Sequence, residues 1–199
     1  VVRAEDNTFD LEMPRGKQFW KEKSEGIFYT RTTGIWQTVW IEALEDTYLS
    51  RIWLTPDLDS KAVDIEYEID GNMYNKYLKA LISFEGVELA EYTISEKRNR
   101  GAFRAVIDQQ AIVKWNFQEE LQWTPENPRL FDIKFYIYNK DGQLIDKVSS
   151  YFGMRKVSIV DGKFMLNNRP YYQKLVLDQG YWEESLLTAP TDEAFIRDI

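Results

Sequence analysis

Four side chains near one end of the chain could bind a hydroxylated ligand: Asp178, Gln179, Tyr181 and Trp182, which flank Gly180. The carboxylate of Asp178 could hold a hydroxyl group through a charge-assisted hydrogen bond, which is stronger than a neutral one. The indole of Trp182 could form an apolar wall, because the C–H faces of sugars stack on aromatic rings. The alternative is a solvent-exposed turn that pivots on Gly180.

The composition narrows the chemistry, because the chain contains neither histidine nor cysteine. Ser-His-Asp and Cys-His nucleophile systems, thiolate zinc sites and disulfides are therefore excluded. Carboxylates, Tyr and Lys remain for acid and base catalysis. We expect no cofactor and no metal, and we assign no catalytic residue.

The charge argues against a nucleic-acid partner, since a formal net charge of -8 leaves no basic face for phosphates. Hydrophobic residues make up 44% of the chain, which is enough for a folded core. No apolar run approaches the roughly 18 residues of a membrane span. The compartment stays open between periplasmic, secreted and cytoplasmic.

An all-β fold is predicted by apolar residues that alternate with polar ones between clear turn signals. The intervals between the turns are typical of an antiparallel β-sandwich. The predicted strands are Thr38–Ala43, Tyr48–Thr55, Ala62–Ile69, Lys76–Phe84, Val87–Ile94, Ala102–Ile107, Phe131–Tyr138 and Leu144–Phe152.

The alternating apolar positions of these strands should face the opposite sheet, because successive side chains in a strand point to opposite faces. These positions are Ile52, Leu54, Val63, Ile65, Tyr67, Ile69, Leu78, Ala80, Ile82 and Phe84.

Several tryptophans invite a sugar-binding hypothesis. Trp36 and Trp40 lie in the segment GIWQTVW, where packing in a core or at a domain boundary is the favoured interpretation. Trp115 and Trp123 flank a loop that contains two prolines, and we expect both rings to pin that loop to the sandwich.

Five motifs occur in an order similar to that of glycoside hydrolase family 2. They are RGKQFW (15–20), TTGIWQTVWIE (32–42), WTPENPRLF (123–131), SYFGMRKVSI (150–159) and FMLNNRPYYQKLVLDQGYW (164–182). The resemblance implies an immunoglobulin-like sandwich at 47–158. It also implies that 1–46 is the C-terminal part of a jelly-roll sugar-binding domain and that 159–199 begins a (β/α)8 catalytic barrel.

Both ends of the chain fit this interpretation of a fragment. Val1–Ala4 is predicted to be half of a strand, and Thr191 is predicted to cap a helix whose first turn carries two acids. The apolar face of that helix, Phe195 and Ile199, should find little to bury it.

The resemblance implies a carbohydrate substrate and a retaining β-glycosidase, with two Glu roughly 5 Å apart as acid/base and nucleophile. Glu183 and Glu184 are adjacent and would point apart, so the pair is expected beyond Ile199 and this chain should be inert alone. β-Galactosidase is the favoured activity of the parent enzyme, ahead of β-glucuronidase and β-mannosidase. A homo-oligomer is left open.

The resemblance also assigns positions to the candidate sugar contacts. Asp6 corresponds to an Asp that reaches the nonreducing sugar, with a plain Asp-Asn turn as the alternative. Tyr172–Leu177 corresponds to the first barrel strand, and residues that follow a barrel strand face the pocket. Asp178, Gln179, Tyr181 and Trp182 would then contact substrate.

Two other classes of protein remain as alternatives. A self-standing carbohydrate-binding or protein-interaction sandwich would show an exposed aromatic strip. A Ca²⁺-dependent module could use the acidic turns at Asp57, Asp59 and Asp64, although a solvated acidic loop is favoured.

Overall fold

The computed structural model describes residues 1–10, 12–95, 98–107 and 121–199, which form two compact units. The sandwich unit is Ala43–Lys174. The terminal unit joins Val1–Glu42 to Leu175–Ile199, so segments from the two ends of the sequence share one body. Trp115, expected to pin a loop, lies outside the described residues.

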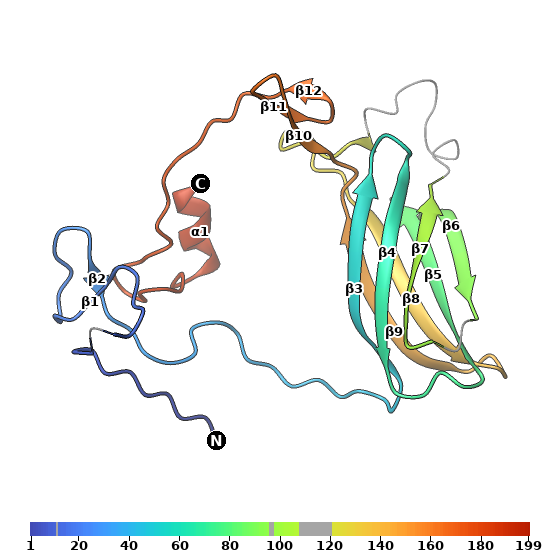
Figure 1. The fold of residues 1–199 in the computed structure, drawn as a ribbon, viewed down its shortest axis with the longest axis horizontal. Coiled ribbons are helices and arrows are strands. Elements are labelled where there is room, and N and C mark those ends of the chain that lie inside the picture. Colours follow the sequence, from blue (N-terminus) through green and yellow to red (C-terminus); the bar gives the residue numbers. More distant parts are fainter. Residues whose placement is uncertain (11, 96–97, 108–120) are drawn as a thin grey trace. The chain divides into compact units, whose positions relative to one another are not determined.

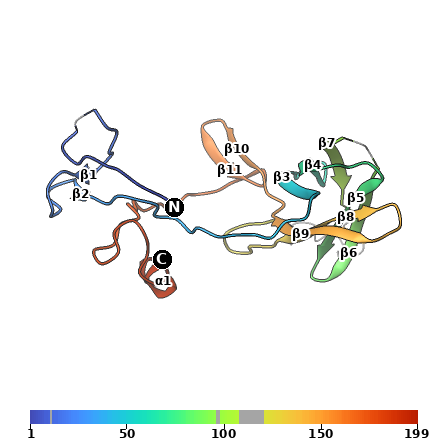
Figure 2. The ribbon, with the colours of Figure 1, turned by 90° about the horizontal axis from the view of Figure 1, so that it is seen from below.

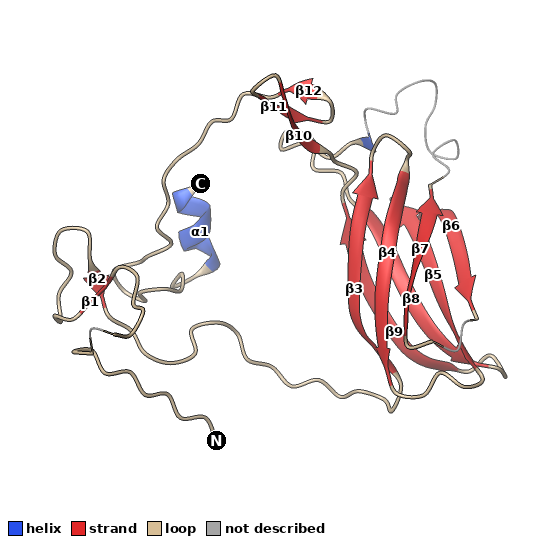
Figure 3. Ribbon diagram, in the orientation of Figure 1, coloured by secondary structure: helices blue, strands red, loops and turns tan. Residues whose placement is uncertain are grey.

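Two antiparallel sheets make up the sandwich (Figure 1), which confirms the predicted fold class. One sheet has the strand order β3-β4-β7 and the other β6-β5-β8-β9. Figure 2 shows the two layers nearly end-on, and Figure 3 shows that strands dominate this unit. The strands are β3 (Tyr48–Asp57), β4 (Ala62–Asp70), β5 (Lys76–Phe84), β6 (Val87–Ile94), β7 (Arg100–Val106), β8 (Phe131–Asn139) and β9 (Leu144–Phe152).

The core lies between the sheets and consists of the inward-facing residues of each strand, as the alternation predicts. Ile52 and Leu54 are partly buried and pack against it, whereas the other expected core residues are buried. Strand β8 adds side chains that are almost wholly removed from water: Phe131, Ile133, Phe135 and Ile137.

Side chains from one sheet also bind backbone groups at the edge of the other. The Leu49 N–H of β3 donates to Asp146 Oδ2 of β9 at 2.8 Å. The Val106 N–H of β7 donates to the Tyr92 hydroxyl of β6 at 2.9 Å, and that hydroxyl donates to the Val106 carbonyl at 3.3 Å. The two sheets are therefore joined along both sides by polar contacts as well as by the core.

A small three-stranded hairpin sheet completes the sandwich unit: β10 (Val157–Val160), β11 (Lys163–Leu166) and β12 (Arg169–Pro170). Two-residue turns join its strands, at Asp161-Gly162 and at Asn167-Asn168, and all four residues have positive φ. Two-residue hairpin turns of this type favour Asn, Asp and Gly, which tolerate the left-handed region.

The terminal unit contains little regular structure: the short parallel pair β1 (Gln18–Phe19) and β2 (Tyr29–Thr30), and the helix α1 (Asp192–Asp198). The predicted cap is confirmed, because Thr191 Oγ1 accepts the Ala194 N–H at 3.3 Å. Within the described residues, no helix has the length and hydropathy to cross a membrane.

Three predicted strands are wrong. Val1–Ala4, Thr38–Ala43 and Tyr172–Leu177 are irregular and exposed, with Val176 91% and Ile41 99% accessible. A strand needs a neighbour for its backbone N–H and C=O groups, and no described segment pairs with these three. An alternating apolar pattern is therefore not sufficient to predict a strand.

The acidic turns are neutralised by basic side chains. Arg104 donates to Asp64 at 2.8 Å and also pairs with Asp57, while Lys156 pairs with Asp59. No group of three or more His, Cys, Asp or Glu suited to a metal ion occurs among the residues that the structure describes. The calcium alternative therefore has no supporting geometry.

We predict that Ile133→Ala destabilises the sandwich unit by about 2–5 kcal/mol, because it leaves a cavity in a close-packed core. Val87→Ala, at a position that is 43% exposed, should cost about 0.5 kcal/mol or less. Urea unfolding followed by circular dichroism measures both. Equal costs would place Ile133 outside the core.

We also predict an acid-sensitive contribution from Asp57. Its hydrogen bonds, first from Arg104 and then from Ser60, lower its pKa from 3.8 to about 2. Because the folded-state pKa is the lower one, ionised Asp57 stabilises the fold above pH 3.8, and this contribution is lost as the pH falls toward 2. Asp57→Asn should flatten the fall in melting temperature over this interval, whereas Asp132→Asn, at an exposed β8 position, should not.

Candidate functional site

The predicted cluster lies on an irregular loop of the terminal unit, and a tight turn shapes it. Asp178 Oδ1 accepts the Gly180 N–H at 2.8 Å, and Gly180 has a φ of 61°. The turn expected as the alternative is thus present. Asp178 and Gln179 are exposed, whereas Tyr181 and Trp182 are half-buried.

Three contacts fix this loop to the N-terminal segment of the same unit. The Tyr181 hydroxyl donates to the Thr30 carbonyl at 2.8 Å, and its ring centroid lies 4.4 Å from that of Tyr29. Lys17 Nζ donates to Gln179 Oε1 at 2.8 Å. Tyr181 therefore acts as an anchor, with its hydroxyl already engaged.

A cavity of about 750 Å³ lies beside the loop in the terminal unit. Aromatic rings form much of its wall, and no charged side chain is among the described residues that line it. The aromatic residues are Trp36, Trp40, Trp182 and Phe195, and the others are Gln37, Thr38, Gln179, Gly180, Leu187, Thr188 and Ala189.

Trp182 has an unsatisfied donor. Its ring meets Phe195 edge to face, with centroids 5.3 Å apart, and its Nε1 is buried without an acceptor among the described residues. A buried unpaired N–H is costly, so such a group marks a place where an oxygen of water or of a ligand would be favoured.

Trp36 and Trp40 are residues whose part in the cavity the sequence analysis missed. Packing in a core is wrong for both, since they are 54% and 69% exposed, whereas packing at a domain boundary stays a prediction. Thr188 Oγ1 donates to the Trp36 carbonyl at 3.1 Å, and Trp40 Nε1 donates to Glu42 at 2.8 Å. The sequence signal for this role was that both tryptophans lie in one short segment with Gly34. That segment becomes part of the cavity wall only through its tertiary contact with residues 179–189.

Asp6 does not line this cavity. It is exposed, and its Oδ2 accepts a hydrogen bond from Thr33 Oγ1 at 2.9 Å. Glu183 and Glu184 are exposed and also absent from the cavity lining. The described cavity can bind through stacking and hydrogen bonds, but it holds no carboxylate pair for acid/base chemistry.

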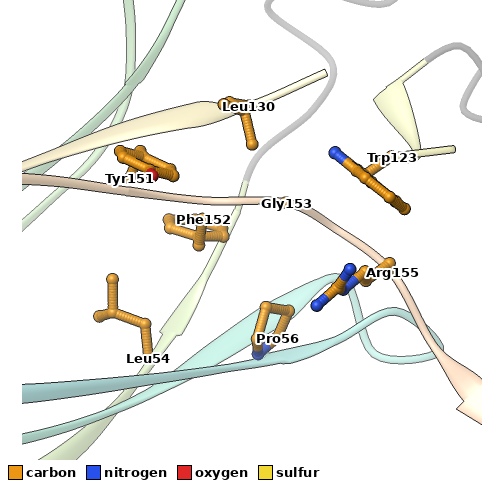
Figure 4. Close-up of a pocket in the computed structure, with 8 residues that line it drawn as sticks. All are labelled: Leu54, Pro56, Trp123, Leu130, Tyr151, Phe152, Gly153 and Arg155. Atoms are coloured by element: carbon orange, nitrogen blue, oxygen red, sulfur yellow. The ribbon is translucent and has the colours of Figure 1, made fainter. Parts of the chain in front are cut away.

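A second cavity, of about 320 Å³, lies in the sandwich unit (Figure 4). Its wall is apolar apart from Tyr151 and Arg155, and the Arg155 guanidinium lies 4.9 Å from the centre of the Trp123 ring. Gly153 allows Trp123 to pack closely against the backbone, because a Cβ there would lie 3.0 Å from Trp123 Cβ and Cγ. Trp123 is thus pinned as expected, and the Arg155 guanidinium stacks on its ring.

Comparison with known proteins identifies the sandwich. Residues 47–155, more than half of the chain, match glycosyl hydrolases family 2. A β-galactosidase of Oenococcus oeni is 26% identical over 145 residues, which cover 70% of this chain and 14% of that protein. A β-galactosidase of Photobacterium profundum is 26% identical over 177 residues, covering 84% and 16%. The chain spans less than a fifth of the length of these relatives.

Solved structures share the fold at low sequence identity. A β-glucuronidase of Bifidobacterium dentium, complexed with coumarin-3-O-glucuronide, superposes with a TM-score of 0.59 at 18% identity, over 77% of this chain and 25% of that one. A Ruminococcus gnavus β-glucuronidase with a C6-substituted uronic isofagomine gives 0.55 at 18%, over 78% and 23%. These similarities concern the fold alone.

We predict that Trp182→Phe leaves α1 as well protected as before, or better, because it keeps a ring beside Phe195 and removes the unpaired N–H. Trp182→Ala removes the ring and should expose the helix. Amide hydrogen exchange of Ala194 and Ile199, both hydrogen-bonded in or next to α1, measures the effect. An equally large loss in both variants would mean that the indole N–H has a partner.

Proposed function

Since this chain belongs to glycosyl hydrolases family 2, we propose that it supplies the immunoglobulin-like sandwich and part of the sugar-contacting surface of a retaining exo-β-glycosidase. β-Galactosidase is the activity we favour. The two catalytic carboxylates would come from outside this chain, because the cavity described above contains none. The chain's own role would be to bind and orient sugar.

One observation carries the proposal: the buried Trp182 N–H donates no hydrogen bond to any residue that the structure describes, and its ring lines an aromatic cavity. A sugar offers both an oxygen to accept that hydrogen bond and a C–H face to stack on Trp36 or Trp40. Indole rings with one polar edge suit such amphipathic ligands. Gln179 lines the cavity and is proposed to bind sugar hydroxyl groups there. Asp178 and Asp6 lie outside the lining and are proposed to accept hydrogen bonds from more distant hydroxyl groups, while Tyr181 holds the loop.

The charge of the site supports a neutral sugar over a uronic acid. No cationic side chain is among the described residues that line the cavity. The Glu42 carboxylate lies beside the wall, where its Oε1 accepts a hydrogen bond from Trp40 Nε1 at 2.8 Å. A uronate carboxylate would lose water there without gaining a counterion, which is unfavourable. The nearby cation is Lys17, which is exposed and hydrogen-bonded to Gln179.

The outer face of the sandwich gives less support to a self-standing carbohydrate-binding module. Tyr77, Tyr138 and Tyr136 form a row on the β5 and β8 strands, with neighbouring ring centroids 5.5 and 5.9 Å apart and planes inclined by 24°. The rings are half-buried, and their neighbouring faces stack on one another. Sugar stacking needs an open face, which this row does not offer.

The test is a titration of the ¹⁵N-labelled chain with methyl β-galactopyranoside and, separately, with methyl β-glucuronide. We expect the Trp182 indole signal, assigned by its loss in Trp182→Phe, to shift with the galactoside at a weak affinity of the order of 1 mM. The glucuronide should bind at least several-fold more weakly, because the cavity wall offers its carboxylate no cation. Aryl β-galactosides should not be hydrolysed by the chain alone.

Matched variants separate the possible outcomes. Trp36→Ala should weaken the galactoside response, whereas Trp53→Phe, on β3 of the sandwich unit, should not. A Lys17→Gln variant that lost binding only to the glucuronide would assign any residual uronate affinity to Lys17. An unmoved Trp182 signal at saturating galactoside would overturn the proposed site.

A further inference from the structure

Asn167 joins three segments of the sandwich unit. Its Nδ2 donates to the Trp123 carbonyl at 3.0 Å, and its Oδ1 accepts the Lys156 N–H at 3.0 Å. Its own N–H donates to the Lys156 carbonyl at 2.8 Å. The residue is only 8% exposed, so it is one of the few buried polar side chains among the described residues.

The backbone at Trp123, to which Asn167 is hydrogen-bonded, is itself held by further contacts. The Trp123 N–H donates to the Met154 carbonyl at 3.0 Å, and the Trp123 side chain packs against Gly153 and Arg155 (Figure 4). A hydrogen bond to this carbonyl therefore ties the β11–β12 turn to the body of the sandwich.

Two further contacts fasten the hairpin sheet at its edges. Asn168 Nδ2 donates to Asp59 Oδ1 at 2.8 Å, and Asp59 also pairs with Lys156. The Tyr171 hydroxyl donates to Glu126 Oε1 at 2.7 Å. The hydrogen bond from Tyr171 lowers the pKa of Glu126, and the contacts from Lys156 and Asn168 lower the pKa of Asp59, so both carboxylates are ionised acceptors.

We propose that Asn167 is a positioning residue, which clamps the hairpin sheet β10-β11-β12 to the sandwich and so fixes the direction in which the chain leaves at Tyr171. The sandwich would then extend functionally to Tyr171, beyond the boundary at 158 expected from sequence. From Tyr171 the chain continues to Asp178–Trp182. A role of this direction in sugar binding rests on the proposed function. The clamp itself is independent of that function.

The chemistry of the position selects asparagine. The turn requires positive φ, 53° at Asn167 and 64° at Asn168, which asparagine tolerates better than most residues with a side chain. The side chain must also donate from one atom and accept at another. Aspartate supplies only the acceptor, and glycine supplies neither while it still permits the turn.

These differences define the variants. Asn167→Gly keeps the turn and deletes both side-chain hydrogen bonds, Asn167→Asp deletes the donor alone, and Asn168→Gly removes only the contact to Asp59. Asn75→Gly is the matched control, because Asn75 also has positive φ, 56°, and lies in an exposed sandwich turn.

The chain has no cysteine, so two spin labels can be placed uniquely, at Ser149→Cys on β9 and at Tyr172→Cys, both exposed positions. We expect a narrow label-to-label distance distribution in the parent chain and with Asn75→Gly. Asn167→Gly should broaden it strongly, with Asn167→Asp and Asn168→Gly between the two. A role confined to stability would lower the melting temperature without broadening this distribution.

Amide exchange gives an independent measurement. With Asn167→Gly, the amides of β10 and β11 should exchange about 10-fold faster, the effect expected for the loss of a hydrogen bond, while those of β4 and β8 stay within about twofold. An unchanged distribution, or uniform acceleration across all strands, would overturn the clamp. Neither readout uses a sugar, so a failed galactoside titration would leave this inference standing.

Discussion

The facing surfaces of the two sheets remove large apolar side chains such as Ile65, Ile82 and Ile133 completely from water. Burying one such side chain contributes about 1.5–3 kcal/mol, and only the sum over the core can offset the conformational entropy of ordering the strands. The hairpin sheet and the described residues 121–130 have few buried residues of their own. They keep their conformations because this core supplies a rigid body to bind to.

Apolar burial does not by itself determine where those attached segments sit, because it is nondirectional. Hydrogen bonds are directional and determine these positions. The groups that make them are the carbonyl of Trp123, the side-chain amide of Asn167 and the carboxylates of Asp59 and Glu126. The sandwich unit thus combines a core that sets stability with a polar end that sets geometry. In the proposed enzyme, a scaffold domain of this kind would orient a site to which it contributes no catalytic group.

Prediction from sequence succeeded where the cause of structure is local or repeats along the chain. Val63, Ile65, Tyr67 and Ile69 alternate and are buried, and Thr191 caps its own helix. Tyr172–Leu177 has strand-like residues but lacks a paired neighbour, and pairing is a nonlocal condition. Trp36 and Trp182 become one wall only through tertiary contact. The Asn167-Asn168 turn, by contrast, had a local signal, since two asparagines separate apolar segments.

The hydrogen bonds that the Leu49 N–H donates to Asp146 and the Val106 N–H donates to Tyr92 have a consequence for contacts between copies of the protein. An open sheet ends in strands with unpaired backbone groups, onto which another molecule can add a strand. On β3 the N–H of Leu49, and on β7 the N–H and C=O of Val106, are bound by side chains from the opposite sheet. Pro56, on the same edge strand β3, has no N–H to offer. Side chains of the opposite sheet and Pro56 therefore reduce the number of backbone groups that β3 and β7 can offer to a strand of another molecule.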